Sequence, residues 1–295
     1  MNAFKRTFSF IHQHPLAKQH LFMAYLKWVI WQIKSRLSPG FHKIRFLDQT
    51  YFLAKRRLTG ITGNIYTGLH EFEEMGFLLH FLRPEDVFFD IGANVGSYTL
   101  LASSVCKAKS FAFEPSPATF NILTQNIALN KLDNLVQLAN KGVGKEKGIL
   151  QFSANEDTTN HVIANDEASN YTIQVPIVPL NDYYPAAKPA LIKIDVEGFE
   201  TEVINGAMNV LQDSNLKAII IELIGGGERY GYNENEIHKK LLSFKFKAYR
   251  YYPLERRIVE TENLGESNTI YLRDLDFVSQ RIKNAKSFKI FNRLI

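Results

Sequence analysis

The chain has 295 residues, of which 45% are hydrophobic and 13% aromatic, and this composition supports a sizeable folded core. One catalytic domain with an N-terminal extension is the simplest division of a chain of this length. The single cysteine, Cys106, has no partner in the chain, which excludes an internal disulfide and favours an intracellular setting. We expect Cys106 to be a buried core residue.

The formal net charge of +5 is unevenly distributed along the chain. Residues 1–57 carry 11 Lys and Arg against one acid, residues 277–295 carry five and no acid, and residues 58–276 carry 19 against 29 acids. Basic ends of this kind bind anionic surfaces such as lipid headgroups, charged glycans or nucleic acid, dock onto the acidic middle of the chain, or are solvated tails. We therefore expect a basic, partly helical extension at 1–60, a catalytic domain at 61–276 and a basic tail at 277–295.

Residues 19–33 form the most apolar helix candidate of the chain, with aromatic side chains spread around it. This segment, with Lys27 inside it, is shorter than the roughly 20 apolar residues that a membrane span needs. We expect this helix to lie in a membrane interface, to pack on the catalytic domain or to form a homo-oligomer contact. The start of the chain lacks a signal-peptide core and cleavage site, so we expect a cytoplasmic protein, with peripheral contact at the inner membrane face as one alternative.

The rest of the chain alternates strand and helix patterns. Strands are predicted at 87–89, 110–113, 135–140, 149–152, 171–178, 190–194, 216–222, 246–252 and 268–273, and helices at 97–106, 116–130, 200–211 and 234–242. This alternation predicts an α/β fold with a Rossmann-like, doubly wound, mostly parallel sheet that has an antiparallel edge strand.

The segment DVFFDIGANVG at 86–96 is the most informative motif. An apolar strand stops at Asp90 and turns through Gly92 and Gly96, and the next strand ends at Glu114, where doubly wound folds place an acid on ribose hydroxyls. Of the G-x-G-x-x-G dinucleotide fingerprint only the first glycine is present, and no G-x-x-x-x-G-K-[ST] occurs. The pattern D-x-G-x-N-x-G therefore suits a ligand without phosphates.

Four segments together resemble the FkbM family of methyltransferases: DIGANVGSYTLLAS, FEPSPATFNILTQNIALN, LIKIDVEGFETEVINGA and IIIEL. The resemblance extends over roughly 64–273 and implies a class I methyltransferase fold. It also implies methyl transfer from S-adenosylmethionine, commonly to a hydroxyl of a sugar or glycosylated product. The cofactor residues that it implies are Asp90, Gly92, Ala93, Asn94, Gly96 and Glu114, with Asn140 at the adenine edge and Tyr66 as a candidate by position.

Several polar side chains close apolar strands, and ligands bind at the carboxyl ends of strands in such sheets. Asp195, Glu197 and Glu222 are not among the cofactor residues, and we expect them to lie at the acceptor side of the site. A carboxylate of raised pKa there would act as a base. Alternatively, Asp195 and Glu222 would bind Mg²⁺. His161, in a polar loop, is a further candidate base, or an exposed residue without a role. The segment 225–233 has the composition of a lid or of a plain surface connection.

The sequence thus favours an S-adenosylmethionine-dependent O-methyltransferase that acts on a small-molecule, glycan or glycolipid acceptor, with lipid linkage suggested by the basic ends. One alternative is an RNA methyltransferase. The absence of N/D-P-P-[YF] and of an RNA-binding module argues against nucleic acid as the acceptor. Another alternative is a non-catalytic scaffold protein that binds S-adenosylmethionine.

Overall fold

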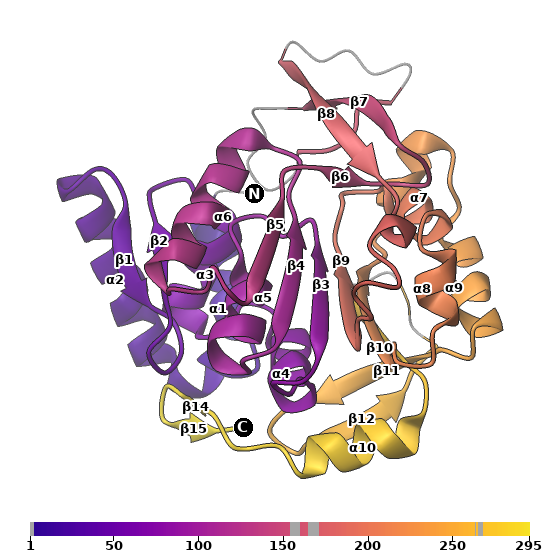
Figure 1. Cartoon of the computed structure of the whole chain (residues 1–295). Coiled ribbons are helices and arrows are strands. Elements are labelled where there is room, and N and C mark those ends of the chain that lie inside the picture. The colour runs from indigo at the N-terminus through magenta and orange to yellow at the C-terminus, as the bar shows by residue number, and fades with distance from the viewer. Residues whose placement is uncertain (1–2, 154–159, 165–170, 263, 265–267) are drawn as a thin grey trace.

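The computed structural model describes residues 3–153, 160–164, 171–262, 264 and 268–295. In these residues eight strands form a central sheet in the order β12-β11-β13-β10-β9-β3-β4-β5 (Figure 1). The strands are β3 (Val87–Ile91), β4 (Lys109–Phe113), β5 (Val136–Ala139), β9 (Leu191–Ile194), β10 (Ala218–Glu222), β11 (Lys247–Tyr252), β12 (Arg257–Glu260) and β13 (Asn268–Leu272).

Strands β5, β4, β3, β9 and β10 run parallel, whereas β13 is antiparallel to both β10 and β11, and β12 is antiparallel to β11. The predicted α/β fold with a mostly parallel sheet and an antiparallel edge is confirmed. The strand at the antiparallel edge is β12, which the sequence patterns did not reveal. The predicted strand at 268–273 is β13, which lies two places inside this edge, between β11 and β10.

Helices cover both faces of the sheet (Figure 1). One face packs against α4 (Phe72–Phe81), α5 (Ser97–Leu100), α6 (Pro117–Leu129) and α10 (Leu275–Lys283), and the other against α7 (Glu200–Asn205), α8 (Met208–Gln212) and α9 (Glu234–Ser243). The buried side chains of β3 alternate between the two faces, because Phe88 belongs to one core cluster and Phe89 to the other. Such strands must be apolar on both sides, which explains the unbroken apolar run that identified β3.

A small second sheet lies beside the carboxyl ends of the parallel strands. It consists of β6 (Gly142–Val143), β8 (Thr172–Val178) and β7 (Gly148–Ser153), in that order. Strands β7 and β8 correspond to the two strands predicted around the polar loop. Phe152, Val175 and Ile177 of this sheet form a separate buried cluster with Val162.

Two predicted helices differ from the observed ones. The helix expected at 97–106 begins as α5 and continues as a π-helical segment over Leu101–Val105. The helix expected at 200–211 is divided into α7 and α8 around Gly206. A Cβ atom at Gly206 would lie 2.0 Å from the carbonyl oxygen of Gly144, so the helix break and the close backbone approach both occur at a glycine.

The two ends of the chain pack on the sheet domain. The N-terminal part contains α1 (Ala3–Gln13), α2 (Leu21–Leu37), the hairpin of β1 (His42–Arg45) and β2 (Tyr51–Ala54), and α3 (Thr59–Thr67). Trp31 and Phe52 share a core cluster with Val95 and Leu123 of the domain. Within the described residues, no helix is both long enough and apolar enough to cross a membrane.

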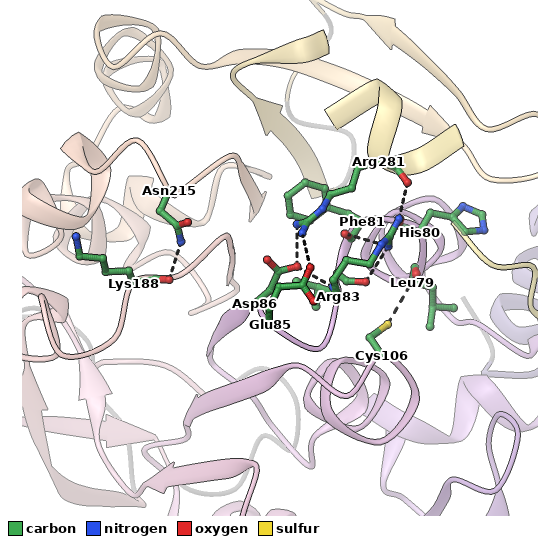
Figure 2. Close-up of polar contacts among 11 residues, drawn as sticks. Leu79, His80, Phe81, Arg83, Glu85, Asp86, Cys106, Lys188, Asn215 and Arg281 are labelled. Atoms are coloured by element: carbon green, nitrogen blue, oxygen red, sulfur yellow. Dashed lines mark hydrogen bonds and ion pairs between the residues drawn. The ribbon is translucent and has the colours of Figure 1, made fainter. Parts of the chain in front are cut away.

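Arginine contacts fix the C-terminal helix α10 beside the turn that precedes β3 (Figure 2). Arg281 Nη1 donates to Asp86 Oδ2 at 2.8 Å, and Arg83 Nη2 donates to the carbonyl oxygen of Arg281 at 2.5 Å. Nearby, Cys106 is buried and its thiol donates to the carbonyl of Leu79 at 3.8 Å. Both end segments contribute side chains to core clusters of the sheet domain. The predicted domain boundaries at 60 and 276 therefore stay a prediction.

We expect Gly206→Ala to lower the free energy of unfolding by about 2 kcal/mol or more, because the new methyl group meets rigid backbone rather than a movable side chain. Urea unfolding measures this loss. Gly148→Ala is the matched control, since a Cβ there has nothing within 4 Å. Equal effects of the two substitutions would contradict the close approach at Gly206.

Candidate active site

A cavity of about 260 Å³ opens at the carboxyl ends of β3, β4, β9 and β10. The loop after β3 and the residues that end the other three strands form its floor, and Val143, Phe152 and Ile177 of the small sheet close one side. Gly60 of α3 and Met75 of α4 line the other side. The strand-end residues that the sequence placed at one edge of the sheet therefore meet in one cavity.

The loop between β3 and α5 depends on a close backbone contact. Gly92 has φ +77°, and a Cβ atom there would lie 1.8 Å from the carbonyl oxygen of Asp195. The backbone N–H groups of Gly92 and Ala93 both donate to the carbonyl of Phe113, at 3.0 and 2.9 Å. Gly96 has φ +95° and caps α5 in the left-handed region. Gly92 and Ala93 therefore tie the loop to the end of β4, and the close approach at Gly92 places the loop against the residue after β9.

Glu114 holds the same loop through its carboxylate. Its Oε2 accepts from the backbone N–H of Asn94 at 3.0 Å, and its Oε1 accepts from the N–H of Ser116 at 2.9 Å. Burial raises the pKa of Glu114 to about 7, against the opposing effect of these two hydrogen bonds. Because the side chain also lines the cavity, it presents acceptor oxygens to a ligand there.

A buried lysine lies between the carboxylates of the site. Lys193 is the strand partner of Asp90, and its Nζ contacts Asp195 Oδ2 at 2.6 Å. The ring of Tyr98 lies 4.8 Å from the same ammonium group, and the Tyr98 hydroxyl donates to Glu71 Oε2 at 2.5 Å. Burial lowers the pKa of Lys193, but Asp195, Glu71 and Asp90 outweigh it and raise the pKa above its usual range. Lys193 therefore stays charged inside the cavity.

Asp90 is almost completely buried beside this lysine. Thr99 Oγ1 donates to its Oδ2 at 2.5 Å. Burial raises the pKa of Asp90 to about 6, and Lys193 and the Thr99 hydrogen bond limit the rise. A buried charged carboxylate needs positively charged or hydrogen-bonding partners. A cationic group of a ligand would be a third partner of Asp90, after Lys193 and Thr99.

Three more carboxylates gather where β9 and β10 end. Oxygen atoms of Asp195, Glu197 and Glu222 all lie within 4.8 Å of one another. The loops that carry them touch through backbone, since a Cβ atom at Gly198 would lie 2.3 Å from the carbonyl oxygen of Gly226. Burial, followed by the charge of Asp195, raises the pKa of Glu197 to about 7 and that of Glu222 to about 8. This group can accept a proton near neutral pH or coordinate a cation.

Residues 90–251 match the family model described as the methyltransferase FkbM domain. The chain belongs to this family. A hexuronic acid methyltransferase, AglP, from Haloferax volcanii is 32% identical over 150 residues, which are 50% of this chain and 60% of AglP. "Methyltransferase 1" from Beauveria bassiana is 33% identical over 148 residues, which are 42% of this chain and 59% of that protein. This chain therefore spans about three-fifths of the length of these curated relatives.

The crystal structure of methyltransferase FkbM from Methylobacillus flagellatus aligns with 70% of this chain and 50% of its own, at a TM-score of 0.46 and 16% identity. The match to the family model begins at Asp90 and includes the ends of β4, β9 and β10. It therefore contains most of the residues that form the cavity floor. Gly60, His70 and Glu71, which also line the cavity, precede the matched residues.

Three residues predicted to belong to the site of the FkbM domain do not line the cavity. Tyr66 packs in a cluster with residues of α1 and α2. Asn140 Nδ2 donates to the carbonyls of Glu114 and Pro115, at 2.8 and 3.0 Å, and so holds the turn after β4. His161 is buried rather than exposed, and its charge acts on Glu197 by lowering the pKa of that carboxyl.

The structure adds residues that the sequence patterns did not single out. Lys193 and Tyr98 are the main ones, and Lys141 also lines the cavity. A lysine inside the apolar strand LIKI is a signal that could have been found, because a fully buried lysine is rare without a charged partner. In the predicted lid segment, Tyr230 donates its hydroxyl to the carbonyl of Val162 at 2.5 Å, next to the cavity. Arg229 lies outside it, in a second pocket beside Glu197 and Glu222.

We expect Glu222→Gln to raise the melting temperature of the protein at pH 8 but not at pH 5. The pKa of Glu222 in the fold, about 8, lies above its ordinary value of 4.5, so its protonated form stabilises the fold, and this stability is lost as the pH rises toward 8. Glutamine is uncharged at both pH values. The gain should be on the order of 1 kcal/mol, or about 2–4 °C.

Differential scanning calorimetry of the ligand-free protein makes this comparison. The exposed residue Glu262 supplies the control, because Glu262→Gln should shift the melting temperature little at either pH. If Glu222→Gln shifted the melting temperature equally at pH 5 and pH 8, Glu222 would not carry the raised pKa.

Proposed function

We propose that this protein is an S-adenosylmethionine-dependent O-methyltransferase whose acceptor is a hydroxyl of a sugar, glycan or glycolipid. The observation that carries the proposal is the charge of the cavity. Among the described residues that line it, two are lysines and one is a histidine, whereas six are acidic: Glu71, Asp90, Glu114, Asp195, Glu197 and Glu222. S-adenosylmethionine carries a sulfonium and an ammonium group against one carboxylate, and its net positive charge offsets this excess. A phosphate-bearing dinucleotide would add to the repulsion.

The cofactor in this proposal occupies the side of the cavity formed by β3 and β4. Glu114 accepts hydrogen bonds from the ribose hydroxyls, as acids after the second strand do in doubly wound folds. Asp90 faces the positively charged methionine end together with the loop from Gly92 to Gly96. Asn94 keeps its backbone N–H on Glu114 and so fixes the carboxylate before the cofactor binds. Preorganisation of this kind lowers the cost of ordering the site on binding.

The acceptor hydroxyl then lies near Asp195, Glu197 and Glu222. Methyl transfer is an in-line displacement in which the acceptor oxygen forms a bond to the methyl carbon as the bond from that carbon to sulfur breaks. The hydroxyl proton passes to a carboxylate, and Glu222 is the best candidate, since its pKa of about 8 makes it a stronger base than an ordinary glutamate. Glu197, with a pKa of about 7, is the second candidate.

A divalent cation is the alternative way to use the same three carboxylates. Oxygen ligands at this spacing suit Mg²⁺, with Asp195 and Glu222 as the ligands that we propose. When bound, the cation would offset the mutual repulsion of the carboxylates and acidify a coordinated hydroxyl. Glu222 is then a ligand rather than a base.

The sugar part of the proposal is supported by the printed activity of AglP, a hexuronic acid methyltransferase, and by the polar, acidic acceptor side of the cavity. Carboxylates around the reacting hydroxyl favour an acceptor that is uncharged at that position. They also disfavour RNA, because its phosphates would face the same negative charge. A scaffold protein without activity would have no use for two carboxylates with pKa values raised to about 7 and 8 in one cluster.

We expect methyl transfer from labelled S-adenosylmethionine to a panel of neutral glycosides and glycolipids. The rate should rise with pH up to about 8, because the base must lose its proton first. Glu222→Gln should reduce kcat by roughly 10²–10⁴-fold, the usual contribution of a positioned base, while S-adenosylmethionine still binds. Glu262→Gln is the control and should leave kcat unchanged.

A chelator distinguishes the two roles of Glu222. If Glu222 is a base, the activity survives EDTA and keeps its pH profile; if the carboxylates hold Mg²⁺, EDTA abolishes the activity and added Mg²⁺ restores it. Binding of S-adenosylmethionine without methyl transfer to any member of the glycan panel would contradict the proposed acceptor class.

A further inference from the structure

Helix α2 has two sharply different faces. Ala24, Trp31 and Ser35 are buried against the rest of the protein. The opposite face carries large apolar side chains in water: Phe22, Leu26, Val29, Ile30, Ile33 and Leu37. Phe22 is 77% exposed and Leu37 is 81% exposed, the two highest values among the large hydrophobic side chains that the structure describes. We call these six side chains the α2 stripe.

The α2 stripe is continuous along the helix. At about 100° per residue, its six members fall within a sector of roughly 100°, and the buried residues fall on the opposite side of the helix. A continuous apolar surface of this kind on a folded protein marks an interaction site rather than scattered surface residues. The helix therefore has one face for its own domain and one for a partner.

The charges around the stripe indicate what the partner is. On the same helical projection, Lys34 flanks the stripe on one side and Arg36 on the other, and both are exposed. Neither α1 nor α2 contains an acidic residue, and Lys5 and Arg6 add further exposed cations. An apolar stripe bordered by cations is the pattern of a helix that lies in the plane of an anionic membrane surface.

A second copy of the chain does not suit these charges. If two α2 stripes packed together, the Lys34 and Arg36 side chains of each copy would border a helix that has no acid to pair with them. A nucleic acid would match the cations but would leave the apolar side chains in water. An anionic lipid surface satisfies both, because acyl chains cover the stripe while headgroups pair with the cations.

We propose that the α2 stripe docks this protein on the surface of anionic membranes. The helix lies in the interface and does not span the bilayer, in agreement with its 17 residues. Helix α2 is also close to the cavity, since it packs along α3 and Gly60 of α3 lines the cavity. A lipid-linked acceptor would follow from this arrangement; that last step rests on the proposed function, whereas the docking itself does not.

Sedimentation of the full-length protein with phosphatidylcholine vesicles, with and without phosphatidylglycerol, tests the proposal. We expect binding to the anionic vesicles that weakens at high salt. Ile30→Gln/Ile33→Gln should reduce the partition coefficient at least about tenfold, because two apolar side chains lose their burial in lipid. Lys34→Gln/Arg36→Gln should reduce it by roughly fivefold for each cation removed, and only on anionic vesicles.

Two matched variants control for a general effect of surface substitution. Ile149→Gln removes an isoleucine that is 68% exposed on β7, and Lys107→Gln/Lys109→Gln removes two exposed lysines elsewhere; both should bind vesicles like the wild type. Calorimetric binding of S-adenosylmethionine, measured on the same variants, reports separately on the proposed function. Failure of the wild type to bind anionic vesicles would overturn the proposal. Self-association that Ile30→Gln/Ile33→Gln abolishes, seen by sedimentation velocity without lipid, would overturn it in favour of a dimer.

Discussion

The ammonium group of Lys193 is the fixed positive charge around which the site is built. It is buried at the end of β9, beside Asp90 on the neighbouring strand and 2.6 Å from Asp195. A buried charge persists only when paired, and here the surrounding carboxylates raise the lysine pKa despite its burial. Lys193 in turn limits the rise in the pKa of Asp90 that burial causes. The buried ammonium group and the carboxylates around it therefore stabilise one another.

Close backbone contacts bring these charges together. Gly92 lies against the carbonyl of Asp195, and Gly198 lies against the carbonyl of Gly226, so three loops meet where any side chain would push them apart. As a result, Asp195, Glu197 and Glu222 share a small volume and repel one another. In the ligand-free protein the repulsion among these carboxylates destabilises the fold. A bound cationic ligand or a bound proton reduces this repulsion. Functional sites commonly trade stability for chemistry in this way.

Much of the domain could be predicted from the sequence because its signals are local. Apolar runs marked the buried parallel strands, and D-x-G-x-N-x-G with Glu114 marked the cofactor side. Helix α4 was missed because nine of its ten residues are buried, so it has no amphipathic period. The place of β13 inside the sheet and the roles of Tyr66 and Asn140 depend on contacts between distant segments. The α2 stripe likewise became visible only when the structure showed which side of an apolar helix is buried.

Calorimetric titration with S-adenosylmethionine tests whether the acidic cavity takes a positively charged cofactor held by Glu114. We expect micromolar binding to the wild type and binding at least about tenfold weaker to Glu114→Gln, because one charge-assisted acceptor of the ribose is lost. Glu262→Gln should bind like the wild type. Absence of binding to the folded wild-type protein would show that the cavity is not the cofactor site, and equal binding to Glu114→Gln would show that Glu114 does not hold the cofactor.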